Sequence, residues 1–170
     1  MTSLHTLGPA GTNCELAAQE WFAREGRPGT VVLHPTLEDA AEQASRTPGA
    51  ALLVAVAYPN LHTLVYAHIG RLVLADSIIT MTHNMVLARR PGVAIPSSAA
   101  SHPAPAGLVP EGLAVRLVTS NTQAALDCAA GAVDACITTL PAMRENDLDL
   151  VRDFGPIAMA FTVHVRTERS

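Results

Sequence analysis

The chain has 170 residues, of which 49% are hydrophobic and 15% are charged, and its formal net charge is −4 at pH 7. This composition provides enough apolar side chains for a folded core and is not that of a disordered chain. All 11 basic residues are arginines, which excludes a lysine Schiff base and a P-loop lysine. The lack of basic clusters argues against nucleic-acid binding. No apolar run is long enough to cross a bilayer, and the N-terminal residues lack the features of a signal peptide, so we expect a cytoplasmic protein.

Strand-like and helix-like segments alternate in the first half of the chain. Its apolar runs predict strands at Leu4–Leu7, Val31–His34, Ala50–Ala57 and Leu72–Met81. Helical patterns lie between them, at residues 13–24, 36–45 and 60–69. Thr36, followed three residues later by Asp39, has the pattern of a capping box with Asp in place of Glu.

From about His83 the alternation begins again. We expect strands at Met85–Ala88, Ala114–Val118 and Val133–Thr138, helices at 120–130 and from about 139, and extended segments at Leu148–Val151 and Ile157–Val165. The proline-rich residues 91–110 are expected to be mostly loop, with at most a short helix after Pro103. The two similar halves predict two α/β lobes, each a mostly parallel sheet covered by helices, with a ligand cleft between the lobes.

Three loops at expected helix starts share small residues, hydroxyls and backbone N–H groups: residues 8–13, 98–103 and 119–122. Helix N-termini attract anions, so these loops predict a site for a small acid with one or two carboxylates. The candidate binding residues are Gly11, Thr12, Asn13, Ser101, Asn121 and Thr122. The alternative is that Thr12 or Asn13, Ser101 and Thr122 only cap their helices.

Side chains that can transfer protons or pair with carboxylates lie near the same segments. His83 follows a long apolar strand, His102 lies inside a candidate loop, and Tyr58 ends a buried strand, so each is a candidate proton donor. Arg90 could pair with a carboxylate. Each also has a structural alternative: packed or exposed histidines, a core tyrosine, and a surface arginine.

The cysteines indicate neither a disulfide framework nor a metal site, because their number is odd and Cys14, Cys128 and Cys136 are far apart in sequence. Cys14 adjoins the first loop and remains a possible nucleophile. The histidines lack metal-ligand spacing, so we expect neither a metal nor any other cofactor.

Several motifs resemble the catalytic domain of prephenate dehydratases. They are residues 6–12, Thr-Leu-Gly-Pro-Ala-Gly-Thr, followed by Glu15, Ala17 and Ala18; Ser101-His102-Pro103; and residues 120–125, Ser-Asn-Thr-Gln-Ala-Ala. The resemblance implies a fold similar to type 2 periplasmic binding proteins, with the site in the interlobe cleft. It also implies that the substrate class is prephenate, a dicarboxylate with a cyclohexadienol ring.

Two motifs of that family are altered. The Glu-Asn-Ser element is replaced by Ala57-Tyr58-Pro59-Asn60, and Thr162 is not followed by the Arg-Phe of the family's Thr-Arg-Phe element. The altered pattern is similar to prephenate decarboxylases of natural-product pathways such as that of bacilysin. These enzymes remove the ring carboxylate, keep the hydroxyl and protonate the ring instead of making it aromatic.

We therefore expect one catalytic domain without a regulatory ACT domain, with one lobe at about 1–82 plus 155–170 and the other at about 83–154. The expected function is non-aromatising decarboxylation of prephenate or a close relative in antibiotic or amino-acid biosynthesis. His83, His102 or Tyr58 would supply the proton, and Thr162 would join the binding residues. The alternatives are a dehydratase that makes phenylpyruvate and a non-catalytic binding module. The expected partner is a small dicarboxylate, and a homodimer is possible.

Overall fold

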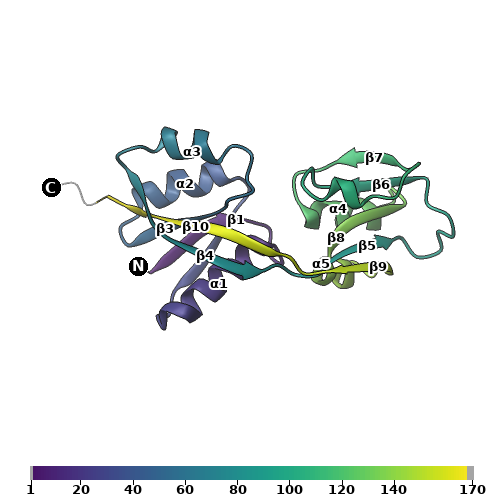
Figure 1. The fold of residues 1–170 in the computed structure, drawn as a ribbon, viewed down its shortest axis with the longest axis horizontal. Helices are drawn as coiled ribbons and strands as arrows, with labels where there is room; N and C mark the ends of the chain where they lie inside the picture. Colours follow the sequence, from purple (N-terminus) through teal and green to yellow (C-terminus); the bar gives the residue numbers. More distant parts are fainter. Residues whose placement is uncertain (1, 168–170) are drawn as a thin grey trace. The chain divides into compact units, whose positions relative to one another are not determined.

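The computed structural model describes residues 2–167 (Figure 1). The chain divides into two compact units. Unit 1 comprises the residues up to Thr82 and those from Ala158 onward, and unit 2 comprises residues 83–157. Each unit contains one five-stranded sheet, so the α/β class predicted from the sequence is confirmed.

The sheet of unit 1 has the strand order β2-β1-β3-β10-β4. Its strands are β1 (Ser3–Leu7), β2 (Thr30–His34), β3 (Ala50–Ala55), β4 (Leu72–Met81) and β10 (Ala158–Arg166). The strands β1, β2 and β3 run parallel, whereas β10 is antiparallel to both β3 and β4. The carboxyl ends of β1, β2 and β3 therefore lie at one edge of the sheet.

Helices cover both faces of this sheet (Figure 1). α1 (Asn13–Glu25) packs on one face, where the core contains Leu4, Leu53, Phe161 and Val163. α2 (Leu37–Arg46) and α3 (Leu61–Ala67) pack on the other face, against Leu52 and Val54. The alternation of buried residues along β3 between the two faces explains why this strand reads as a continuous apolar run.

The sheet of unit 2 has the order β7-β6-β8-β5-β9. Its strands are β5 (Met85–Arg89), β6 (Ser98–Ser101), β7 (Ala114–Leu117), β8 (Ala135–Thr139) and β9 (Asp149–Gly155). The helices α4 (Asn121–Ala129) and α5 (Leu140–Glu145) pack against one face. A short 3-10 helix, η1, spans Ala106–Leu108.

Residues 91–110 are mostly loop with a short helix after Pro103, as expected, but the prediction missed β6, which lies within them. Its sequence, Ser-Ala-Ala-Ser, carries no apolar alternation. It becomes a strand through parallel pairing with β7 and β8, which buries Ala99 and Ala100 completely. Small side chains that fit between two layers give no period-2 signal in the sequence.

The expectation of mostly parallel sheets also needs correction, because both sheets are mixed. In unit 2, β5 is antiparallel to β8 and to β9, while β6 is parallel to β7 and β8. The capping prediction at Thr36 is confirmed: its hydroxyl accepts a hydrogen bond from the Asp39 N–H at 3.0 Å. None of the helices within residues 2–167 is long and apolar enough to cross a membrane.

Candidate functional site

Five predicted site residues lie at one edge of the sheet of unit 1. Gly11, Thr12 and Asn13 form the turn from β1 into α1. Tyr58 follows the end of β3, and Thr162 on β10 pairs with Val54, one residue before that end. The structure therefore brings these five residues to the carboxyl ends of β1 and β3.

The polar groups of the loop before α1 are already hydrogen-bonded to neighbouring residues of the same segment. The Thr12 hydroxyl accepts from the Glu15 N–H at 3.3 Å and donates to the Leu7 carbonyl at 3.1 Å. The Gly11 N–H donates to the Glu15 carboxylate at 2.7 Å. Gly11 has a φ of 80°, a conformation that favours glycine. The Gly11 N–H, which the sequence predicted to bind a substrate anion, is therefore already hydrogen-bonded to the carboxylate of Glu15 in α1.

Tyr58 and Thr162 also have partners within unit 1. The Tyr58 hydroxyl donates to Glu38 at 2.6 Å. Burial, together with the Glu38 carboxylate, raises the pKa of Tyr58, so this phenol is a poor proton donor at neutral pH. The Thr162 hydroxyl lies 3.4 Å from the Val54 carbonyl and 3.0 Å from Nε2 of His164.

Unit 2 brings together a second group of predicted residues, at the carboxyl ends of β6, β7 and β8. Ser101 ends β6 and is completely buried, and Asn121 and Thr122 begin α4, which follows β7. The Asn121 amide nitrogen lies 3.9 Å from the sulfur of Met85, the first residue of β5, and His83 precedes Met85 by two residues. Because β5 is antiparallel to β8, its start lies at this same edge.

The start of α4 has two features that suit an anion. First, its first turn contains no acidic residue, whereas Glu15 occupies that turn in α1, and Glu38 and Asp39 occupy it in α2. Second, the Thr122 hydroxyl and the Asn121 amide oxygen are buried without a hydrogen-bond partner among the described residues. Thr122 is only 7% exposed. Buried polar atoms in native proteins normally have partners, so a ligand or water is expected here.

His102 follows Ser101 at this edge and is half-buried. Its Nδ1 accepts the Ala104 N–H at 3.2 Å, which leaves the proton of the neutral ring on Nε2. Burial lowers the pKa of His102, so the ring is mostly neutral at pH 7. A neutral imidazole donates a hydrogen bond from Nε2 but is a weak acid. The Ser101 hydroxyl donates to the His102 carbonyl at 2.9 Å.

Two further candidates, Arg90 and Cys14, are unsuited to the roles that the sequence suggested for them. Arg90 follows the end of β5, at the opposite edge, where it pairs with Asp134 at 3.5 Å. Sequence spacing did not reveal this, because β5 runs antiparallel to β8 and its two ends face opposite edges. Cys14 is buried in the core, and burial raises the pKa of its thiol to about 11, so it is unsuited as a nucleophile.

Sequence reasoning missed several residues that shape these edges. Glu15 and Glu38 bind the groups offered to the substrate in unit 1. Ser120, not Thr122, caps α4 by accepting the Gln123 N–H at 3.0 Å, and this frees the Thr122 hydroxyl for another role. The Ser-x-x-Gln spacing from Ser120 to Gln123 is a capping-box signal that could have shown this.

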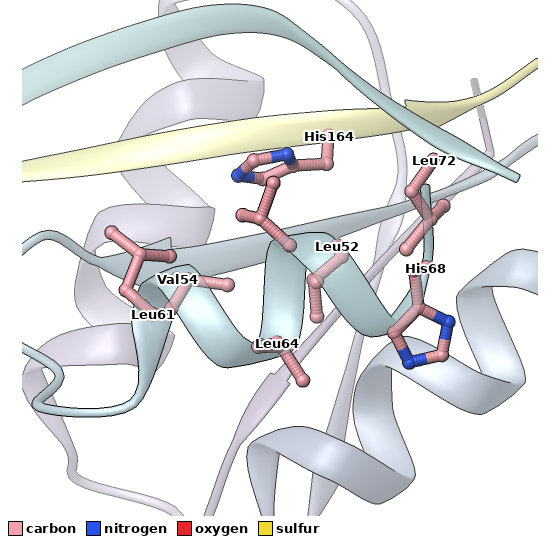
Figure 2. A pocket seen from close by; sticks show the side chains of 8 residues that line it. Leu52, Val54, Leu61, Leu64, His68, Leu72 and His164 are labelled. Atoms are coloured by element: carbon pink, nitrogen blue, oxygen red, sulfur yellow. The ribbon is translucent and has the colours of Figure 1, made fainter. Parts of the chain in front are cut away.

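An apolar hollow of unit 1 has none of the predicted site residues in its lining, although His164, which lines it, lies 3.0 Å from the Thr162 hydroxyl. Figure 2 shows its lining, with His164 on β10 and His68 after α3 among leucine and valine side chains. The enclosed space holds about one water molecule, which is too little for a substrate. Among residues 2–167, no three His, Cys, Asp or Glu side chains are grouped as metal ligands would be.

The buried histidines predict that acid destabilises unit 1. Burial lowers the pKa values of His5, His68 and His164 from the reference of 6.5. Below that value the unfolded chain binds protons that the folded unit does not, so stability is present above it and falls as pH decreases toward the lowered values. Urea unfolding followed by the fluorescence of Trp21 should show a lower midpoint at about pH 5.5 than at about pH 7.5.

His164→Gln provides the control for this prediction, because glutamine keeps a polar group and does not titrate. The variant should lose less stability between the two pH values than the unchanged protein. An unchanged midpoint in the unchanged protein would contradict the prediction.

The fold defines the class of protein first. Over 99% of this chain and 62% of the other, it matches a prephenate dehydratase from Arthrobacter aurescens in complex with L-Phe, with a TM-score of 0.75 and 17% identity. It also matches the periplasmic VFT2 domain of Bordetella pertussis BvgS, with a TM-score of 0.56 and 12% identity over 97% of this chain and 80% of the other. These TM-scores show that the chain shares a fold with prephenate dehydratases and with periplasmic VFT domains.

The sequence comparisons point within that class. The chain is 25% identical to a prephenate decarboxylase of Bacillus subtilis (strain 168), over 96% of this chain and 86% of the relative. It is 32% identical to a prephenate decarboxylase of Planktothrix agardhii (strain NIVA-CYA 126/8) over 72 residues, which are 37% of this chain and 36% of that relative. No protein-family profile matches the chain. The chain therefore has the fold of prephenate dehydratases, and it is similar in sequence to prephenate decarboxylases.

Proposed function

We propose that this protein is a lyase that decarboxylates prephenate, or a close relative, without making the ring aromatic. The observation that carries the proposal is the similarity to the Bacillus subtilis prephenate decarboxylase along 96% of this chain. The start of α4 supports it, because this helix end carries no carboxylate of its own in its first turn and has two buried oxygens without partners. A dicarboxylate with a hydroxyl group matches both properties.

We assign the roles as follows. The N-terminus of α4 and the Thr122 hydroxyl bind a carboxylate of the substrate, with the Nε2–H of His102 as a neighbouring donor. Ser101 supports this arrangement by donating its hydroxyl hydrogen to the His102 carbonyl. His83 donates the proton that the ring receives after carbon dioxide leaves. In unit 1, residues 11–13 and Thr162 remain proposed binding residues, although Gly11, Thr12 and Thr162 form hydrogen bonds within the unit. The scheme requires neither a metal nor an organic cofactor.

The reaction balances with one proton. The bond between the ring and its carboxylate breaks, and carbon dioxide leaves. The electron pair moves through the neighbouring double bond to a ring carbon, which then takes the proton from His83. The ring hydroxyl stays in place. The valine that follows Thr162 supports this outcome, because Val163 is completely buried in the core and offers no hydrogen-bond donor to a departing hydroxyl.

The test is incubation of the purified protein with prephenate, followed by mass spectrometry and proton NMR. Loss of carbon dioxide with the hydroxyl and a non-aromatic ring retained is the expected result. Formation of phenylpyruvate would show that the protein is a dehydratase and would overturn the proposal. Unchanged prephenate, relative to a sample without protein, would exclude turnover of this substrate and favour a binding module. A heat-denatured sample controls for the spontaneous reaction.

A further inference from the structure

The buried oxygen of Asn121 differs chemically from the other groups at the start of α4. This amide oxygen only accepts hydrogen bonds, and it is buried without a donor among the described residues. The amide nitrogen lies 3.9 Å from the Met85 sulfur. Since sulfur is a weak acceptor that the nitrogen can approach as a donor, this orientation of the amide is better than the flipped one. The buried Asn121 amide oxygen therefore lacks a hydrogen-bond donor among the described residues.

The neighbouring groups have the opposite requirement. The first N–H groups of α4 are donors without helical partners, and the Thr122 hydroxyl can donate as well. Donors suit the ionised carboxylates of the proposed substrate. At neutral pH the only O–H group of that substrate is its ring hydroxyl, so it is the only part that can donate to Asn121.

We infer that Asn121 accepts a hydrogen bond from the ring hydroxyl and thereby decides that the hydroxyl stays on the ring. This inference rests on the proposed function. It makes Asn121 a residue that determines the product, whereas Thr122 binds a carboxylate.

The chemistry explains how an acceptor has this effect. Both routes from prephenate release carbon dioxide and consume one proton, and they differ in the atom that receives it. If the proton reaches the hydroxyl oxygen, water leaves and the ring becomes aromatic. If it reaches a ring carbon, the hydroxyl remains. An amide oxygen that accepts the hydroxyl hydrogen holds the hydroxyl in one orientation and cannot itself supply a proton to that oxygen, so the transition state for loss of water is disfavoured.

The test is the ratio of phenylpyruvate to hydroxylated product, measured by proton NMR for a set of full-length variants. Asn121→Leu has a similar size and no acceptor, and we expect it to raise the ratio about ten-fold, the effect of losing one hydrogen bond. Asn121→Ala, which suits a helix, serves if the leucine variant does not fold. Asn121→Asp keeps an acceptor oxygen, and its ratio should remain near that of the unchanged protein.

Thr122→Val is the matched control one position along the helix. It removes a hydroxyl at constant shape, so we expect a higher KM and an unchanged product ratio. Equal ratios in folded Asn121→Leu and unchanged protein would overturn the inference and leave the proposed function intact. An equal rise in the Asn121 and Thr122 variants would also overturn it, because any loosening of the site would then suffice. If the unchanged protein does not decarboxylate prephenate, the proposed function itself fails, and that result is visible before any variant is compared.

Discussion

Replacing His83 by alanine is expected to lower kcat for decarboxylation by about 10²- to 10⁴-fold, the usual contribution of a positioned general acid. Three residues were candidates for this role, and the other two have features that weaken them as acids. His102 is mostly neutral at pH 7, since burial lowers its pKa. The Tyr58 hydroxyl is held by Glu38, and burial raises its pKa. His83 lies at the edge of unit 2 that also carries Asn121 and Met85.

Two further histidine variants test this assignment. His62 is exposed on α3, and His62→Ala should leave kcat and KM unchanged. His102→Ala should raise KM more than it lowers kcat, since we propose that this ring donates a hydrogen bond to a carboxylate in both ground and transition states. If His102→Ala abolishes turnover while His83→Ala retains it, the proton comes from His102 instead.

The sequence predicted the fold class well, because local patterns determine it. The apolar run at Ala50–Ala55 and the cap at Thr36 give the same signals in isolation as in the folded unit. β6 escaped prediction because its structure comes from its neighbours. The sequence Ser-Ala-Ala-Ser is extended only where β7 and β8 pair with it.

For the candidate site, the sequence indicated which loops lie at the carboxyl ends of the strands, but it did not show which side chains already hydrogen-bond to the groups of those loops. Ser101, Asn121 and Thr122 lie at the carboxyl ends of β6 and β7, and their role in binding stays a prediction. The sequence did not show that Glu15 would take the Gly11 N–H, or that Arg90 would lie at the opposite edge. Those outcomes depend on which side chains reach a given atom and on strand direction, and one-dimensional spacing encodes neither of them.

Replacing Phe161 by alanine is expected to lower the free energy of unfolding of unit 1 by about 3–5 kcal/mol, the usual cost of removing a fully buried phenylalanine. Phe161 lies on β10, is completely buried, and belongs to the core cluster that contains Trp21. Trp21 is the only tryptophan in the sequence, so urea unfolding followed by its fluorescence reports on this core directly.

The matched control is Ile79→Ala on the neighbouring strand, β4. Ile79 pairs with Ala160 in the same sheet but is 75% exposed, so its truncation should cost about 0.5 kcal/mol or less. Both changes remove apolar atoms from adjacent strands, and Phe161→Ala removes more of them and from a buried position. A large cost for Phe161→Ala and a small one for Ile79→Ala would show that the layer between α1 and the sheet stabilises unit 1. Similar costs for both would contradict the prediction, because strand pairing rather than this buried layer would then dominate the stability of the sheet.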